Sequence, residues 1–184
     1  MTGEPDVTFA SELLPGSYCT VRTRGPFGWV IRAFTSSTVD HAFVVLGGGL
    51  IAEATVWGCR VDGIAQYQGQ TMFTDAGDRV SASQRSQICK QARSYAGREY
   101  GWPDIALIGL RRLGVRAGWL RRVLADRDAL ICSELVALAG AAGGQDWLCG
   151  TGDAALVTPA DLSRRPGMER VIWDLPRPPP GGGP

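Results

Sequence analysis

Between two apolar runs of similar length stand three consecutive glycines, Gly47-Gly48-Gly49. The first run covers residues 40–46 and the second covers residues 50–56. Glycine adopts the positive-φ conformations of tight turns without steric cost, and short apolar runs on either side of such a turn are typical of paired strands. The pattern predicts an antiparallel β-hairpin, and any fold of the chain has to contain it.

The register of this hairpin decides which polar side chains share a face. If Leu46 and Leu50 flank the turn, Phe43 lies opposite Glu53. Side chains at alternate positions of a strand point the same way, so His41 and Glu53 become diagonal neighbours, with Cα atoms about 7–8 Å apart. A shift of one residue would put Glu53 on the other face. We therefore expect the Glu53 carboxylate to contact the His41 imidazole.

A second stretch places a cysteine at the start of a predicted helix. Residues 128–140 begin with a short apolar run and continue with apolar side chains at helical spacing, and Gly143-Gly144 predicts the end of the helix. Cys132 lies where the helical pattern begins. The positive end of a helix dipole favours the thiolate over the thiol. A thiolate nucleophile needs a base, and His41 is the only histidine of the chain.

Length and composition restrict the class of protein. The chain has 184 residues, of which 45% are hydrophobic and 20% charged, so we expect one globular domain. A net charge of +1 gives no overall field that would attract nucleic acid, and no nucleic acid partner is expected. No apolar run approaches the ~20 residues of a transmembrane helix. Because no signal peptide is visible at the N-terminus, a cytoplasmic location is expected.

The five cysteines are odd in number and form no C-x-x-C pair. This spacing argues against a zinc site and against a disulfide framework, and it favours free thiols in a reducing compartment. No metal or cofactor is expected. Four of the cysteines have no base nearby in the sequence pattern, and we interpret them as structural: Cys19, Cys59, Cys89 and Cys149.

The remaining elements predict an α+β fold, with a small, mostly antiparallel sheet packed against helices. Residues 1–14 are expected to be a poorly ordered start, with Phe9, Leu13 and Leu14 as anchors. The other predicted elements are a strand at 18–23, a short helix or strand at 29–34, a helix at 81–96 capped by Ser81 or Ser83, a helical turn from Thr158 and a strand at 171–173. The predicted domain covers residues 1–174, and residues 175–184 form a flexible tail rich in Pro and Gly.

Five segments together resemble the circularly permuted branch of the NlpC-type, papain-like cysteine hydrolases. Asp40 to Val45 carries the strand-borne histidine, Ile51 to Ala54 the acidic residue, and Ile131 to Val136 the cysteine. Gly97 to Trp102 is similar to the Gly-x-x-Tyr-x-Trp segment of that family, and Thr158 to Leu162 to a segment near its C-terminus. The matching order extends over residues 15–174 and implies a permuted papain-like fold.

The resemblance also implies roles for four residues. Cys132 would be the nucleophile, His41 the base, Glu53 the residue that orients His41, and Tyr100 a residue bordering the active site that could donate to an oxyanion. Each also has an ordinary structural interpretation: Cys132 as a small core residue, His41 as a structural side chain, Glu53 as an ion-pair partner and Tyr100 as a core aromatic.

Two departures from the family pattern bear on function. Asp40 replaces the small residue often found before the histidine, which could change the pKa of His41. The segment between Tyr100 and Cys132 is long and basic, with five arginines and no acidic residue in residues 105–124. This segment is either a packed amphipathic helix pair with a solvated basic face or a surface that contacts anionic lipid or cell-wall polymer.

Three functions remain open at this stage. The first is a cysteine peptidase or amidase with a Cys-His-Glu triad, for which a peptidoglycan peptide is one candidate substrate. The second is an acyltransferase or lipid-ester hydrolase with the same triad. The third is a catalytically silent structural or binding domain, for example in a phage particle. A cell-wall substrate would require release by lysis or transport in a virion.

Overall fold

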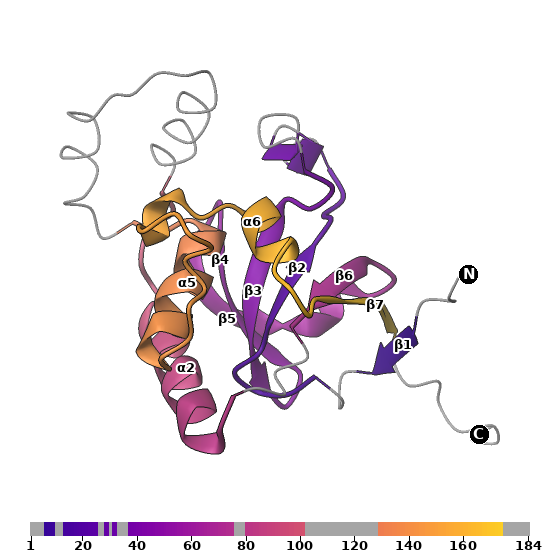
Figure 1. Ribbon diagram of the computed structural model, residues 1–184. Helices are drawn as coiled ribbons and strands as arrows, with labels where there is room; N and C mark the ends of the chain where they lie inside the picture. The colour runs from indigo at the N-terminus through magenta and orange to yellow at the C-terminus, as the bar shows by residue number, and fades with distance from the viewer. Residues whose placement is uncertain are drawn as a thin grey trace.

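The computed structural model describes residues 6–9, 13–25, 28–29, 31–32, 37–75, 80–101 and 129–174 (Figure 1). Its strands are β1 (Asp6–Phe9), β2 (Tyr18–Val21), β3 (His41–Gly47), β4 (Leu50–Thr55), β5 (Gly58–Gly63), β6 (Thr71–Thr74) and β7 (Glu169–Asp174). Its helices are η1 (Ile64–Tyr67), α2 (Ala82–Ser94), α5 (Cys132–Ala142), η2 (Ala154–Leu156) and α6 (Pro159–Ser163).

The described strands form one sheet in the order β1-β7-β6-β2-β3-β4-β5. Neighbouring strands are antiparallel except β1 and β7, which are parallel. Helices α2 and α5 lie side by side on one face of the sheet (Figure 1). The predicted α+β class with a mostly antiparallel sheet is confirmed.

The predicted hairpin is β3 and β4, with Phe43 opposite Glu53 as expected. The turn is shorter than predicted, because Gly47 pairs with Leu50 and only Gly48 and Gly49 form the turn, at φ +61° and +75°. An irregularity between Val45 and Gly47 absorbs the additional residue. The bulge keeps the predicted pairing at the other end of the hairpin.

Strand β3 is buried on both faces, which explains its continuous apolar sequence. Ala42, Val44 and Leu46 belong to the core cluster that includes α2 and α5. Phe43 and Val45 belong to a second cluster that includes Tyr67 of η1. The hairpin therefore forms the boundary between two apolar layers.

Local sequence signals fix the helix ends. Ser81 caps α2, since its hydroxyl accepts from the Gln84 N–H and the Gln84 side chain accepts from the Ser81 N–H. Thr158 and Asp161 form the same reciprocal pair at α6. Helix α5 ends at Gly143, as the glycine pair predicts.

The expectation of a poorly ordered start over residues 1–14 is wrong for part of that range. Residues 6–9 form β1, which pairs in register with β7. The backbone of a short strand gains its hydrogen bonds from a distant partner, which no local pattern reveals. Of the expected anchors, Leu13 is buried, whereas Leu14 is 40% exposed.

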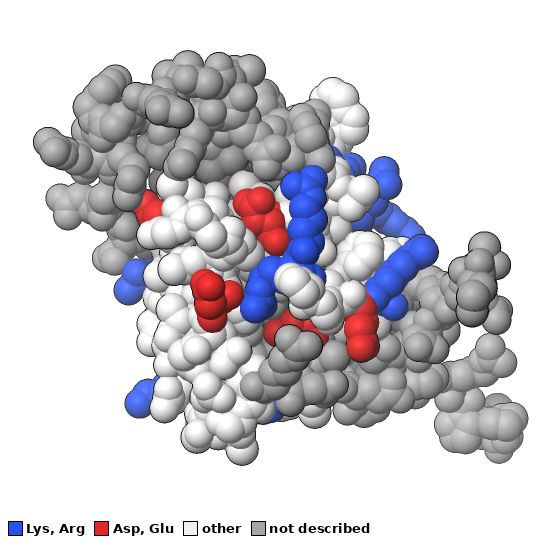
Figure 2. Space-filling model, in the orientation of Figure 1, with Lys and Arg blue, Asp and Glu red and all other residues white. Residues whose placement is uncertain are grey.

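Two predicted features lie outside the described residues: the basic segment 105–124 and the tail 175–184. Within the described part of the chain, no helix has the length and apolar character needed to cross a membrane. On the face in Figure 2, basic and acidic side chains of the described residues are interspersed rather than gathered by sign.

Candidate active site

His41 is the first residue of β3, and its imidazole contacts Glu53 from the neighbouring strand. His41 Nε2 lies 2.9 Å from Glu53 Oε2, and both residues are buried. The diagonal arrangement on one face of the hairpin is the one that the register predicts. The expected contact between these two side chains is present.

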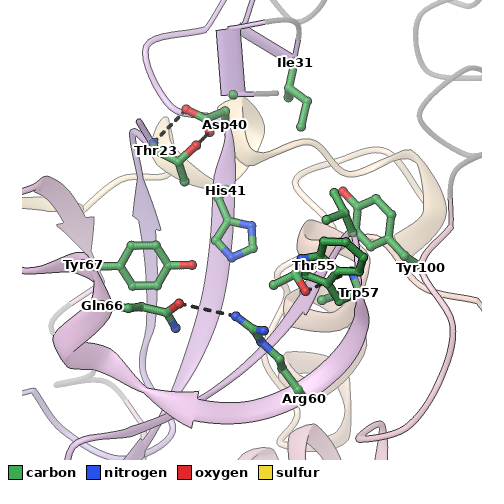
Figure 3. A pocket seen from close by; sticks show the side chains of 13 residues that line it. Thr23, Ile31, Asp40, His41, Thr55, Trp57, Arg60, Gln66, Tyr67 and Tyr100 are labelled. Atoms are coloured by element: carbon green, nitrogen blue, oxygen red, sulfur yellow. Dashed lines mark hydrogen bonds between the residues drawn. The ribbon is translucent and has the colours of Figure 1, made fainter. Parts of the chain in front are cut away.

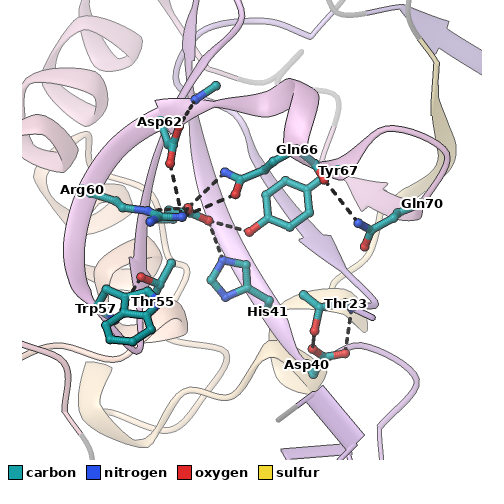
Figure 4. Close-up of polar contacts among 12 residues, drawn as sticks. Thr23, Asp40, His41, Thr55, Trp57, Arg60, Asp62, Gln66, Tyr67 and Gln70 are labelled. Atoms are coloured by element: carbon teal, nitrogen blue, oxygen red, sulfur yellow. Dashed lines mark hydrogen bonds and ion pairs between the residues drawn. The ribbon is translucent and has the colours of Figure 1, made fainter. Parts of the chain in front are cut away.

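The Glu53 carboxylate has three further partners, shown in Figure 4 by the dashed lines from Arg60, Gln66 and Tyr67. The Tyr67 hydroxyl donates to Oε2 at 2.5 Å. Arg60 donates to Oε1 from Nε and Nη2, both at 3.1 Å, and Gln66 Nε2 donates to Oε1 at 3.1 Å. A fully buried carboxylate is stable only with such compensation.

The sequence did not point to these three partners. Arg60 lies opposite Glu53 in the pairing of β4 with β5. A turn placed at residues 56–57 would have predicted this pair from the alternation of side chains on the two strands. Gln66 and Tyr67 come from η1, a short 3-10 helix, where strand periodicity gives no information.

The electrostatics of the pair favour the charged forms of both groups. Burial by itself would lower the pKa of His41, but the neighbouring Cys132 together with the hydrogen bond and charge of Glu53 raise this pKa to about 10. Burial by itself would raise the pKa of Glu53, but the hydrogen bond and charge of His41, with Tyr67 and Arg60, lower it to about 2. An imidazolium–carboxylate pair is therefore the stable state at neutral pH.

Cys132 is the first residue of α5 and is close enough to His41 to contribute to the raised pKa of the imidazole. Because His41 Nε2 is engaged with Glu53, Nδ1 is the ring nitrogen available to a second partner. His41, Phe43 and Val45 occupy alternate positions of β3, so alternation would place their side chains on the same face of the sheet. Phe43 and Val45 belong to the apolar cluster on the side of η1 rather than α5. His41 stands at the end of the strand, as the first residue of β3.

The next two residues of α5 have structural contacts. The Ser133 hydroxyl donates to the Val157 carbonyl at 2.6 Å, which ties the start of α5 to the end of η2. The Glu134 carboxylate accepts from the Ile131 N–H at 3.4 Å, in the first turn of the helix. Both contacts fix the helix end that carries Cys132.

His41 lines a pocket of about 240 Å³ (Figure 3). Arg60, Gln66 and Tyr67 border it on the side of the Glu53 network, and Trp57 and Tyr100 border it on the other (Figure 3). Tyr100, the fourth candidate from the sequence, thus lies at the pocket that His41 reaches. Burial and the nearby Cys132 raise its pKa, so it is a neutral phenol at neutral pH. Cys132 is not among the described residues that line the pocket.

Asp40, the departure from the family pattern, has its own partners. Its carboxylate accepts from the Thr23 N–H at 3.0 Å, from the Thr23 hydroxyl and from Arg32. A Cβ at Gly28 would collide with these side chains. The cluster joins the helical residues 28–29 and 31–32 to the segments that follow β2 and precede β3, and it forms one wall of the pocket.

In each of the other four cysteines, burial raises the pKa of the thiol. Burial raises the pKa of Cys19 to about 12 and that of Cys59 to about 11. Burial also raises the pKa of Cys89 and of Cys149, which are half-buried. All five cysteines are free, and these four favour the thiol form at neutral pH.

Among the described residues, no group of three or more His, Cys, Asp or Glu side chains is placed to hold a metal ion. No model of a known protein family matches the chain, and no curated protein matches it.

Removing the Tyr67 hydroxyl tests the Glu53 network. Tyr67→Phe keeps the ring stacked on Phe43 at 5.1 Å but removes the 2.5 Å hydrogen bond to the carboxylate. We expect a loss of about 1.5–3 kcal/mol in the free energy of unfolding, the range for a hydrogen bond to a charged group. Urea denaturation measures it. Tyr95→Phe is the matched control, since the Tyr95 hydroxyl accepts only a neutral hydrogen bond from Gln91 Nε2. An equal loss in both variants would show that the charge on Glu53 does not matter.

Proposed function

We propose that the chain is a cysteine hydrolase of the circularly permuted papain-like type, which cleaves an amide bond through Cys132, His41 and Glu53. The observation that supports the proposal is the His41 imidazole, which is hydrogen-bonded to Glu53 at 2.9 Å and whose pKa is raised in part by the nearby Cys132. A cysteine at a helix start, a histidine and an orienting acceptor are the groups that thiol-dependent acyl transfer requires.

In the proposed reaction, the Cys132 sulfur attacks the amide carbonyl carbon and forms a tetrahedral intermediate. His41 then transfers its proton to the leaving nitrogen, the C–N bond breaks, and an acyl-cysteine thioester remains. Water, deprotonated by His41, attacks the thioester and releases the acid and the thiolate. Glu53 keeps the imidazole oriented and stabilises its protonated form.

The negative oxygen of each intermediate needs donors. The backbone N–H of Cys132 is one candidate, because the first N–H groups of a helix have no partner within the helix. The Tyr100 hydroxyl is the second candidate, since this residue lines the pocket and is held as a neutral phenol.

Acyl transfer or lipid-ester hydrolysis with the same residues is the second candidate function. It is favoured by the exposed Trp57 side chain at the pocket, which is 84% exposed and offers an apolar surface. Product analysis with amide and ester substrates, peptidoglycan fragments included, separates these reactions. Contact of residues 105–124 with an anionic surface stays a prediction, which co-sedimentation with vesicles tests.

Alkylation of the five thiols tests the proposal without a known substrate. Iodoacetamide at mildly acidic pH is expected to label Cys132 first, because a histidinium beside a cysteine favours the reactive thiolate. Peptide mapping by mass spectrometry identifies the labelled site. Cys89 and Cys149 are internal controls, since both are half-buried and have raised pKa values. Labelling of either before Cys132 would contradict the proposed nucleophile.

A further inference from the structure

The charged side chains at the pocket are already neutralised. Asp40 pairs with Arg32. Arg60 pairs with Glu53 at 3.1 Å and with Asp62 at 3.2 Å, and His41 pairs with Glu53. Among the described residues that line the pocket, each charged side chain therefore has an opposite charge in contact. A charged group of a substrate would have to compete with these pairs.

The opposite side of the pocket is apolar and carries an exposed indole. Trp57 is 84% exposed, although it lines the pocket with Ala54, Val56 and Ile31. An exposed large aromatic side chain at a concave site is typical of ligand-binding surfaces, where its burial on binding contributes affinity.

The backbone that carries Trp57 is held in place. The Trp57 N–H donates to the Thr55 hydroxyl oxygen at 3.3 Å. The next residues are tied to the loop that leads to Tyr100, since the Cys59 N–H donates to the Arg98 carbonyl at 2.8 Å. A Cβ at Gly58 would lie 2.8 Å from that same carbonyl oxygen. The backbone of the turn is fixed against the loop, so the place from which the exposed indole projects is set before a ligand binds.

We propose that this pocket binds an uncharged, apolar group of the substrate beside the bond that is cleaved, and that Trp57 is the residue that contacts it. The inference rests on the proposed function, because it assumes that Cys132 and His41 act on a substrate in this pocket. Arg60 is the alternative recognition element, for a carboxylate, but its guanidinium already serves two carboxylates.

A matched set of chloroacetamides tests the substrate class. In each reaction the cysteine sulfur forms a bond to the chloromethyl carbon and chloride leaves. The probes are chloroacetamide itself and its N-hexyl, N-(5-carboxypentyl) and N-(5-ammoniopentyl) derivatives. The rate at Cys132 is measured by mass spectrometry and divided by the rate with glutathione. We expect the hexyl probe to react about tenfold faster than either charged probe, as burial of about two methylene groups would give.

Two tryptophan variants identify the contact. In Trp57→Ala the ratio of the hexyl rate to the chloroacetamide rate should fall to near the ratio for glutathione. Trp29→Ala is the control, because Trp29 is 66% exposed but is not among the described residues that line the pocket. Its ratio should equal that of the wild type.

The outcomes separate the two proposals. No reaction of Cys132 with any probe would overturn the proposed function. Reaction of Cys132 at equal normalised rates with all probes, or faster with a charged probe, would overturn the apolar substrate class while leaving the nucleophile in place. A hexyl preference that survives in Trp57→Ala would overturn the role of Trp57.

Discussion

Replacing His41 with alanine is expected to abolish hydrolysis, with a fall in kcat/KM of at least about 10²–10⁴-fold, the usual contribution of general acid–base catalysis. The chain has no other histidine that could take the proton. The variant should also lose the preferential alkylation of Cys132 at mildly acidic pH, because an imidazolium with a pKa of about 10 no longer lies beside the thiol. Stopped assays of hydrolysis and timed alkylation measure the two effects.

The loss must be separated from unfolding. Glu53 keeps its bonds to Arg60, Gln66 and Tyr67 in this variant, so the fold should survive, and a cooperative urea transition checks this. Cys89→Ser and Cys149→Ser are the activity controls and should hydrolyse substrate at the wild-type rate. Retention of hydrolysis in folded His41→Ala would rule out this residue as the base.

The hairpin was predictable because its signals are local. A glycine turn between two apolar runs determines the pairing, and alternation then places His41 and Glu53 on one face. The turn itself was one residue too long in the prediction, since a bulge before Gly47 has no sequence signature of its own. The pairing near His41 is unaffected because the bulge lies at the turn end of the strand.

Contacts between segments that are distant in the sequence were harder to predict. Strand β1 forms by pairing with β7 at the other end of the chain, and no local sequence pattern in either strand indicates this pairing. The partners of Glu53 in η1 depend on how a short 3-10 helix packs over the sheet. Asp40 is a residue that could change the pKa of His41. Its carboxylate binds Thr23 and Arg32, and the sequence did not point to these partners because their segment has no clear periodicity.

The proposed pairing of Cys132 with His41 comes from chemistry and from the family resemblance, not from the strand and helix patterns. A helix start and a strand start separated by more than half of the domain can meet only through the packing of α5 on the sheet. Alternation alone would put His41 on the face away from α5, with Phe43 and Val45. How close the two side chains come therefore depends on how α5 packs against β3, which the sequence patterns do not determine.

Glu53→Gln is expected to make the free energy of unfolding less dependent on pH in acid. The pKa of Glu53 falls from 4.5 in the unfolded chain to about 2 in the fold. Its ionised form therefore stabilises the fold by about 3 kcal/mol above pH 4.5, and this contribution disappears as the pH falls through 2. The variant lacks the contribution at every pH, so the difference from wild type should shrink as the pH falls below 4.5.

The pKa of His41 sets the alkaline limit of the stabilisation that the same ion pair provides. Its pKa rises from 6.5 to about 10, so the stabilisation is complete below pH 6.5 and is lost as the pH rises through 10. The difference between wild type and Glu53→Gln should therefore have a plateau between pH 4.5 and 6.5 and decline on both sides. Urea titrations across this range measure the difference directly.

Asp62→Asn is the matched control for that measurement. Asp62 pairs with the same Arg60 at 3.2 Å, but its side chain is 44% exposed, whereas that of Glu53 is fully buried. An exposed pair contributes at most about 1 kcal/mol because solvent screens it. Two results would mean that Glu53 is not the ionised centre of the network. One is a loss of unfolding free energy in Asp62→Asn as large as that in Glu53→Gln. The other is an unfolding free energy of Glu53→Gln that falls in acid in parallel with that of the wild type. The expected contrast arises because Glu53→Gln removes a buried charge and one of the two acceptor oxygens that His41, Tyr67 and Arg60 share, whereas Asp62→Asn changes an exposed pair.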